Sequence, residues 1–244
     1  IMKLLIVRHG DPDYDIDSLT EKGWKEVEYL SQKLSKLEVK AFYVSPLGRA
    51  KDTAAPTLKK MGRTATECEW LKEFPCQIWR PDVTDKKIIA WDWLPQDWMA
   101  DERFFQYDHW FENEAMQEGH VKEEYDRVTG EFDRLLAKHG YEREGHYYKV
   151  NEENNDTVIF FCHFGLECVL LSHLLSISPM VLWHGCVAAP SSVTTLVTEE
   201  RRQGIASFRM SSFGDISHLY ANNEPPAFAA RFCEAYGNKG QRHD

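Results

Sequence analysis

The chain of 244 residues lacks the features that mark membrane-bound and secreted proteins. Its most apolar stretch, residues 158–175, contains His163, Glu167 and His173, which a transmembrane helix would exclude. The apolar run near the start covers only Leu4–Val7, which is too short for the core of a signal peptide. We therefore expect a cytoplasmic protein without a membrane partner.

Basic residues are scarce relative to acidic ones. The chain has 29 Lys and Arg against 39 Asp and Glu, which gives a formal net charge of −10. Bulk charge of this sign disfavours binding to nucleic acid, so we expect no such partner. The six cysteines include no CxxC pair, and their scatter predicts free thiols instead of disulfides. An anionic ligand would need a local cluster of arginines.

The chain does contain an alternation of buried strands and amphipathic helices. Apolar runs predict strands over Lys3–Val7, Ala41–Ser45, Thr64–Trp70 and Thr157–Cys162, and a hairpin over Ser192–Glu199 and Gly204–Ser211. Helical spacing predicts five helices. The first begins after the N-cap Thr20, the second ends at about Met61, the third begins near Val121, the fourth covers Leu166–Leu175, and a short fifth follows Pro226. This order predicts a three-layer α/β fold with a mostly parallel central sheet and helices on both faces.

The segment from about residue 74 to residue 119 shows no regular periodicity but is rich in large aromatic side chains. We interpret residues 1–244 as one domain, with this segment inserted as a cap over one end of the sheet. The alternative that its tryptophans form a satellite core stays open. These tryptophans are Trp79, Trp91, Trp93, Trp98 and Trp110.

Two histidines occupy equivalent places in the predicted fold. His9 directly follows the first strand in the tripeptide Arg-His-Gly, and His163 directly follows the strand that ends at Cys162 in the tripeptide His-Phe-Gly. The carboxyl ends of parallel strands border the ligand crevice of an open α/β sheet, so we expect the two imidazoles to converge. Arg49 follows the second strand at the start of a helix. Together with Arg8, these donors suit a phosphate dianion.

The combination of these motifs resembles the histidine phosphatase superfamily, also called the phosphoglycerate mutase-like family. The resemblance extends from Leu4 to about Leu219, and it implies phosphoryl transfer through a phosphohistidine on His9. Arg8, Arg49 and His163 would hold the phosphoryl oxygens, and neither a metal nor a cofactor is implied. Further matching segments are Leu19–Gly23, Arg49–Ala54, Ser192–Leu196 and Ser217–Leu219.

The leaving alcohol requires a proton, which in this family comes from a carboxylic acid after the third strand. Glu73 matches that position and completes the catalytic set implied by the resemblance, with His9 and His163. A dianionic phosphate and an aromatic wall nearby would raise its pKa, as a general acid at neutral pH requires. Glu67 and Glu69 are competing candidates.

Two positions depart from the common family pattern. Asp11 stands where many members have Glu or Thr, and it either orients a ligand or turns the chain. Phe164 stands where a small residue is frequent, and it either packs in the core or narrows the pocket.

The sequence predicts a metal-independent phosphatase that hydrolyses a phosphomonoester of a small molecule, as a monomer or a homodimer. A phosphoglycerate mutase ranks second, since holding a second anion calls for basic residues near the pocket and the candidates there are few: Lys72, Arg80 and Arg103. A phosphatase of phosphopeptides would require an open groove. A non-catalytic phosphate-binding module is a further alternative, against which the retention of the whole residue set argues.

Overall fold

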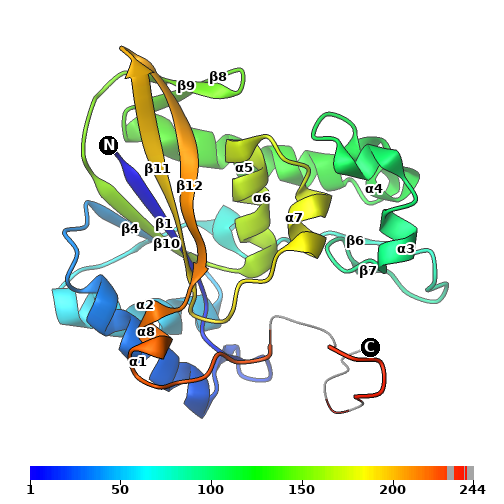
Figure 1. The fold of residues 1–244 in the computed structure, drawn as a ribbon, viewed down its shortest axis with the longest axis horizontal. Helices are drawn as coiled ribbons and strands as arrows, with labels where there is room; N and C mark the ends of the chain where they lie inside the picture. The colour runs from blue at the N-terminus through cyan, green and yellow to red at the C-terminus, as the bar shows by residue number, and fades with distance from the viewer. Residues whose placement is uncertain (230–233, 239, 241–244) are drawn as a thin grey trace.

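The computed structural model describes all residues of the chain except 230–233, 239 and 241–244. The main strands are β1 Lys3–Arg8, β4 Ala41–Val44, β5 Thr66–Glu67, β8 Tyr141–Glu144, β9 Tyr147–Val150, β10 Thr157–Cys162, β11 Val193–Arg202 and β12 Ile205–Asp215. They form one eight-stranded sheet in the order β5-β4-β10-β1-β11-β12-β9-β8 (Figure 1).

The strands of this sheet run mostly in one direction. Strands β5, β4, β10 and β1 pair in parallel, and β11, β12, β9 and β8 follow through antiparallel pairings. Because each antiparallel pairing reverses the direction, only β11 and β9 oppose β1. The predicted mostly parallel sheet is confirmed, and its parallel half contains the strands that carry the candidate site.

Helices cover both faces of the sheet. Because side chains alternate along β1, Leu5 and Val7 pack on one side with α1 and α2, whereas Leu4 and Ile6 pack on the other with α5 and α6. The predicted three layers are therefore confirmed. The longer helices are α1 Glu21–Leu34, α2 Gly48–Met61, α5 Val121–Lys138 and α6 Phe164–Leu175, and the shorter ones outside the inserted segment are α7 Pro179–Gly185 and α8 Ser217–Tyr220.

The predicted ends of the first two helices agree with the structure. The Thr20 hydroxyl accepts the N–H of Gly23 and caps α1, as expected of an N-cap threonine. Gly62 ends α2 in the left-handed conformation, with φ +64°.

The predicted strand over Thr64–Trp70 is wrong in most of its length. Only Thr66–Glu67 pairs with β4, and a 3₁₀ turn, η1, follows over Glu69–Leu71. Trp70 and Leu71 are both buried. Two consecutive side chains cannot both face one side of a strand, so the chain turns off the sheet edge to bury them together.

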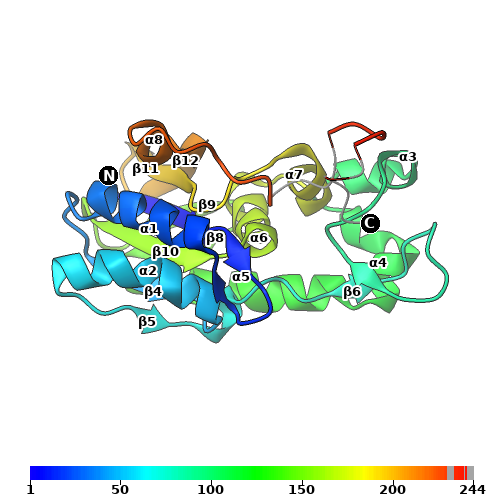
Figure 2. The same ribbon diagram turned by 90° about the horizontal axis from the view of Figure 1, so that it is seen from below.

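The inserted segment gathers at one end of α5, away from α1 and α2 (Figures 1 and 2). Trp93, Trp98 and Trp110 are buried, whereas Trp91 is partly exposed and Trp79 is exposed. These three buried tryptophans belong to the same hydrophobic core as β1, β10, α5 and α6, so the alternative of a separate satellite core is wrong. Its elements are β6 Gln77–Ile78, β7 Ile88–Ile89, α3 Pro95–Trp98, η2 Glu102–Phe105, η3 Trp110–Glu112 and α4 Glu114–Glu118.

After α8 the chain runs toward the inserted segment (Figures 1 and 2). The predicted helix after Pro226 does not form over residues 224–229, and its continuation lies outside the described residues. The Lys22 ammonium instead contacts this stretch, donating to Glu224 and to the carbonyl of Pro225.

Two further expectations concern whole-chain properties. None of the described helices is long and apolar enough to span a bilayer. The cysteines Cys68, Cys76, Cys162, Cys168 and Cys186 are free thiols, as predicted, and Cys233 lies outside the described residues.

Candidate active site

His9 and His163 meet at the carboxyl ends of the adjacent strands β1 and β10. Their ring centroids lie 5.1 Å apart with an interplanar angle of 58°, and both residues are buried. The backbone N–H of His9 donates to the carbonyl of Cys162 at 3.0 Å, which extends the parallel pairing to the site. The predicted convergence of the two imidazoles is therefore confirmed.

The tautomer of His9 follows from its hydrogen bond. Nδ1 lies 2.8 Å from the carbonyl oxygen of Gly10, and because a carbonyl only accepts, Nδ1 carries the proton in the neutral ring. Burial, assisted by the charge of Arg8 and by His163, holds the pKa of His9 well below its ordinary value. The ring is therefore neutral near pH 7, with a lone pair on Nε2.

The ring of His163 is held by the strand beside it. Its Nε2 lies 2.8 Å from the hydroxyl of Ser45, which follows β4. Nδ1 is buried and has no hydrogen-bond partner in the described part of the chain. Burial, with the charges of Arg49 and Arg8, keeps the pKa of His163 well below its ordinary value. A neutral imidazole is thus fixed with one nitrogen left for a ligand.

The guanidinium of Arg8 is oriented by two carbonyl groups from distant parts of the chain. Nη1 donates to Ala188 at 2.7 Å, and Nη2 donates to Ala229 at 3.2 Å. Its Nε is buried without a partner among the described residues. Burial lowers the pKa of Arg8, but a guanidinium stays charged at neutral pH. One fixed cation therefore lies beside the imidazoles.

Arg49 is held by a carboxylate that the sequence analysis did not single out. Asp17 accepts from Arg49 Nη1 at 2.8 Å and from the backbone N–H of Gly48 at 2.7 Å. These contacts lower the pKa of Asp17 although its partial burial opposes them. A Cβ on Gly48 would lie 2.2 Å from the carbonyl of Asp17, so only glycine fits there. Arg49 Nε is buried without a partner in the described structure.

The carboxylate of Glu73 lies at the N-terminus of α6. It accepts backbone N–H groups from Phe74 at 2.8 Å, Gly165 at 3.2 Å and Leu166 at 2.8 Å. Burial raises the pKa of Glu73, whereas these donors and Arg8 oppose the rise. The sequence-predicted acid therefore lies beside the phosphate-binding candidates.

The two competing acids lie in a different environment. Glu69 is exposed and pairs with Lys72 at 2.8 Å and with Arg127 at 2.9 Å, contacts that lower its pKa. Glu67 is exposed and pairs with Lys51 at 3.3 Å. Neither carboxylate has the burial that a general acid at neutral pH requires.

Gly165 allows Glu73 and the inserted segment to approach α6. A Cβ at this position would lie 2.7 Å from Glu73 Oε1 and 2.7 Å from Trp91 Nε1. Trp91 donates to the carbonyl of Phe74 at 3.3 Å, and its ring meets the edge of buried Phe164 at 6.5 Å. Phe164 is thus part of an aromatic wall beside Glu73, and Trp91 is the tryptophan that brings the insertion to the site.

Asp11 has a local structural role. Its side chain accepts the hydroxyl of Thr20 at 2.7 Å, and its N–H donates to buried Glu26 at 2.7 Å. Both contacts fix the turn that leads from β1 to α1. Of the two roles predicted for Asp11, orienting a ligand or turning the chain, these contacts match the second.

Several supporting residues were not predicted from the sequence. Ser45 and Asp17 hold His163 and Arg49, and the Thr53 hydroxyl accepts the N–H of Gly10 at 2.9 Å while donating to the carbonyl of Arg49 at 2.7 Å. Ser45 and Thr53 lie in or beside the quoted motifs, which was the available signal. Among the described residues, no group of three or more His, Cys, Asp or Glu side chains is arranged to hold a metal ion.

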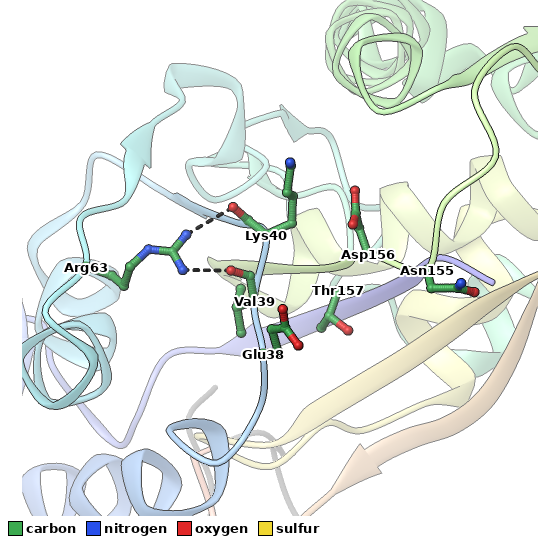
Figure 3. A pocket seen from close by; sticks show the side chains of 7 residues that line it. All are labelled: Glu38, Val39, Lys40, Arg63, Asn155, Asp156 and Thr157. Atoms are coloured by element: carbon green, nitrogen blue, oxygen red, sulfur yellow. Dashed lines mark hydrogen bonds between the residues drawn. The ribbon is translucent and has the colours of Figure 1, made fainter.

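An open hollow of about 410 Å³ lies at the opposite end of the sheet (Figure 3). It is bordered by Lys40 before β4 and by Thr157 at the start of β10, and therefore lies at the amino ends of these strands. The guanidinium of Arg63 donates hydrogen bonds to the carbonyls of Val39 and Lys40 there, at 2.7 and 3.0 Å. The hollow contains none of the predicted site residues, so it is separate from the candidate active site.

The structure is that of an α/β protein with two buried histidines at the carboxyl ends of adjacent parallel strands. The chain belongs to the histidine phosphatase superfamily (branch 1), whose family model matches residues 4–210. A 2,3-bisphosphoglycerate-dependent phosphoglycerate mutase from Thermoplasma acidophilum is 35% identical over 60 residues, which span 20% of this chain and 30% of the mutase.

Solved structures share the fold at low sequence identity. A phosphoserine phosphatase mutant from Entamoeba histolytica in complex with phosphoserine has a TM-score of 0.59 at 18% identity, covering 90% of this chain and 100% of the other. A mycobacterial glucosyl-3-phosphoglycerate phosphatase with VO3 has a TM-score of 0.54 at 21% identity, covering 86% and 98%. These likenesses support the fold assignment.

Proposed function

We propose that the protein is a phosphatase that hydrolyses a small-molecule phosphomonoester through a phosphohistidine on His9. The observation that carries this proposal is the hydrogen bond from His9 Nδ1 to the Gly10 carbonyl, 2.8 Å long. It leaves the Nε2 lone pair free in a ring kept neutral by burial. A neutral imidazole in a fixed tautomer is a competent nucleophile near pH 7.

The reaction proceeds in two steps, transfer of the phosphoryl group to His9 and hydrolysis of the phosphohistidine. In the first, His9 Nε2 forms a bond to phosphorus while the bond from phosphorus to the ester oxygen breaks, and Glu73 gives its proton to the leaving alkoxide. In the second, water attacks phosphorus, the bond to Nε2 breaks, and Glu73 takes the proton of the water. Phosphate and the alcohol leave, and both side chains return to their initial states.

The donors around the imidazoles suit the transferring phosphoryl group. Its transition state spreads negative charge over three equatorial oxygens, which fixed cations and N–H groups stabilise. Nε of Arg8, Nε of Arg49 and Nδ1 of His163 are buried without partners in the part of the chain that the structure describes. Leaving three such atoms unsatisfied is costly unless a ligand meets them, and an oxyanion accepts hydrogen bonds from all three.

Hydrolysis is favoured over mutase activity by the basic residues near the inserted segment. Arg80 pairs with Asp82 at 2.7 Å, and Arg103 pairs with Asp101 at 2.8 Å. Lys72 is paired with Glu69. A mutase needs free cations to retain a second anionic group, and the candidates named from the sequence are engaged with acids. The similarity to a phosphoglycerate mutase covers less than a third of that protein. This short match does not outweigh the pairing of the basic residues, so mutase activity ranks second to hydrolysis.

A turnover screen tests the proposal. The protein is incubated with sugar phosphates, phosphoglycerates, nucleotides and phosphoamino acids in the presence of a chelator, with His9→Asn as control. We expect release of inorganic phosphate by the wild type and none by the control. Exchange between phosphoglycerates faster than phosphate release would establish a mutase, binding of phosphate without turnover would establish a binding module, and loss of turnover in chelator would contradict metal independence.

A further inference from the structure

Glu167 is a buried acid that the proposed reaction does not use. It lies one turn into α6, where its N–H donates to the carbonyl of His163 at 2.8 Å. The residue is 1% exposed, and neither carboxylate oxygen has a hydrogen-bond partner within the described chain. Burying an unpaired carboxylate is costly, so the group favours its neutral form.

The surroundings of Glu167 contain one cation. Arg8 on β1 attracts the carboxylate, whereas Glu73, which follows η1, repels it. The Thr194 hydroxyl on β11 also stabilises the charged form, more than Arg8 does, although it lies outside normal hydrogen-bond geometry. The remaining titratable neighbours are the buried thiols of Cys162 on β10, Cys168 on α6 itself and Cys186 after α7, which stay protonated at neutral pH.

Arg8 therefore interacts electrostatically with the unpaired carboxyl group of Glu167 as well as belonging to the candidate phosphate site. Burial raises the pKa of Glu167 to about 7, so its charge changes within the working range of the protein. An ionised Glu167 offsets the charge of Arg8 and repels a dianion, whereas a neutral Glu167 leaves the cation to the ligand.

We infer that Glu167 is a positioning residue for the phosphate site, which takes up a proton from solvent when a dianionic oxyanion binds to Arg8. The inference rests on the proposed function, because it assumes that the oxyanion occupies this site. Binding of the oxyanion then grows weaker as the pH rises above neutrality, because Glu167 must take up a proton while the proton concentration in solution falls. His9 and His163 titrate well below this range. The pKa of Glu73 is also raised by burial and this acid lies beside the same oxyanion, so the effect of Glu167 is the difference in pH dependence between the wild type and Glu167→Gln.

Glu26 on α1 provides a matched control. It is also buried, its pKa is also raised to about 7, and it also attracts Arg8, more weakly than Glu167 does. However, one of its oxygens accepts the N–H of Asp11, so its burial is partly compensated locally. Replacement of either residue by glutamine removes one buried titrating carboxyl group of similar pKa.

Tungstate is a suitable probe because it mimics phosphate and does not itself titrate between about pH 6.5 and 9. Its dissociation constant is measured by calorimetry over this range for the wild type, Glu167→Gln and Glu26→Gln, each checked for folding by its circular dichroism spectrum. For the wild type, we expect the dissociation constant to rise above pH 7 by up to tenfold per pH unit. Glu167→Gln should show a clearly weaker dependence on pH than the wild type, and Glu26→Gln should retain the wild-type dependence.

A wild-type pH dependence in Glu167→Gln would overturn the inference, whatever Glu26→Gln does. If Glu167→Gln does not fold, calorimetry of Glu73→Gln, which lacks the other acid of raised pKa beside the site, in two buffers of different ionisation enthalpy decides. Proton uptake on tungstate binding near pH 7.5 supports the inference, and no uptake overturns it. Absence of tungstate binding at every pH would overturn the proposed function as well, which separates the two failures.

Discussion

His9 and His163 lie with their ring centroids 5.1 Å apart, and each ring is fixed through one nitrogen only. Gly10 holds Nδ1 of His9 and Ser45 holds Nε2 of His163, both at 2.8 Å. The other nitrogen of each ring makes no hydrogen bond to the described residues. Two neutral imidazoles with one available nitrogen each can divide the work, one attacking phosphorus and one binding its oxygens.

Glu73→Gln should separate substrates by their leaving groups. Because glutamine cannot donate the proton, hydrolysis of alkyl phosphates should slow by roughly 10²–10⁴-fold. Aryl phosphates, whose leaving groups need little protonation, should lose far less. Glu69→Gln is the control, since Glu69 is exposed and paired with lysine and arginine. Equal losses on both ester types, or a larger effect of the control, would assign the proton donor elsewhere.

Gly165→Ala should damage the site through a single methyl group. The added carbon would lie 2.7 Å from both Glu73 Oε1 and Trp91 Nε1, so one of these groups must move. We expect kcat for an alkyl phosphate to fall at least about tenfold, with a stability loss of about 1–3 kcal/mol. Gly185→Ala is the control, because nothing lies within 4 Å of the added carbon. Full activity in Gly165→Ala would show that this close approach is unimportant.

Two tryptophans of the insertion should behave differently. Trp110→Ala should lower the free energy of unfolding by about 3–5 kcal/mol, because Trp110 is fully buried, and it should leave the ranking of substrates unchanged. Trp91→Ala should cost less stability but raise KM or alter that ranking, since Trp91 adjoins Gly165 and Phe164. Kinetics and thermal melting distinguish these effects. An unchanged ranking in Trp91→Ala would make the whole insertion a scaffold.

The parallel half of the sheet and the histidines could be predicted because their signals are local. The buried runs of β1 and β10 each end one residue before a histidine, and strand order brings such ends together. By contrast, β8 and β9 contain charged and aromatic residues, and only half of their side chains are exposed. Their hairpin is attached to the sheet by the pairing of β9 with β12, a distant contact that composition does not reveal.

The contacts that orient Arg8 and Arg49 also could not be predicted from the sequence. Ala188 and Ala229 hold Arg8 through backbone carbonyls, which every residue type possesses. Asp17 holds Arg49 from a left-handed conformation with φ +46° in a loop of alternating aspartates. Nothing in the local pattern distinguishes Asp17 from Asp13 or Asp15, because the choice depends on how the loop meets α2.

The contribution of two buried carboxyl groups to the stability of the protein should fall as the pH rises from about 4.5 to about 7. Burial raises the pKa of Glu26 and of Glu167 from 4.5 to about 7, so each of these groups binds more protons in the folded state than in the unfolded state in this window. The lowered pKa values of His9 and His163 act in the opposite direction, so the contribution is read from variants of the two carboxyl groups. This stabilisation is complete below about pH 4.5 and is lost as the pH passes 7. At about 1.4 kcal/mol for each pKa unit, it amounts to at most roughly 3 kcal/mol for Glu167.

Chemical denaturation across this range measures the effect. Glu167→Gln should be more stable than the wild type at pH 8, and this difference in stability should shrink as the pH falls toward 4.5. Glu69→Gln should follow the wild type. If the difference in the free energy of unfolding between Glu167→Gln and the wild type stays constant between pH 4.5 and 8, the assignment of Glu167 as a buried carboxyl group of raised pKa is contradicted.

The most direct test of the account is to trap the phosphorylated residue. The wild type is mixed with an activated aryl phosphate, quenched at alkaline pH, digested and analysed by mass spectrometry. We predict one phosphoryl group on His9, labile in acid, and no adduct in His9→Asn, which should also have lost turnover. A phosphoryl group on His163, or full turnover by His9→Asn without any adduct, would contradict the account.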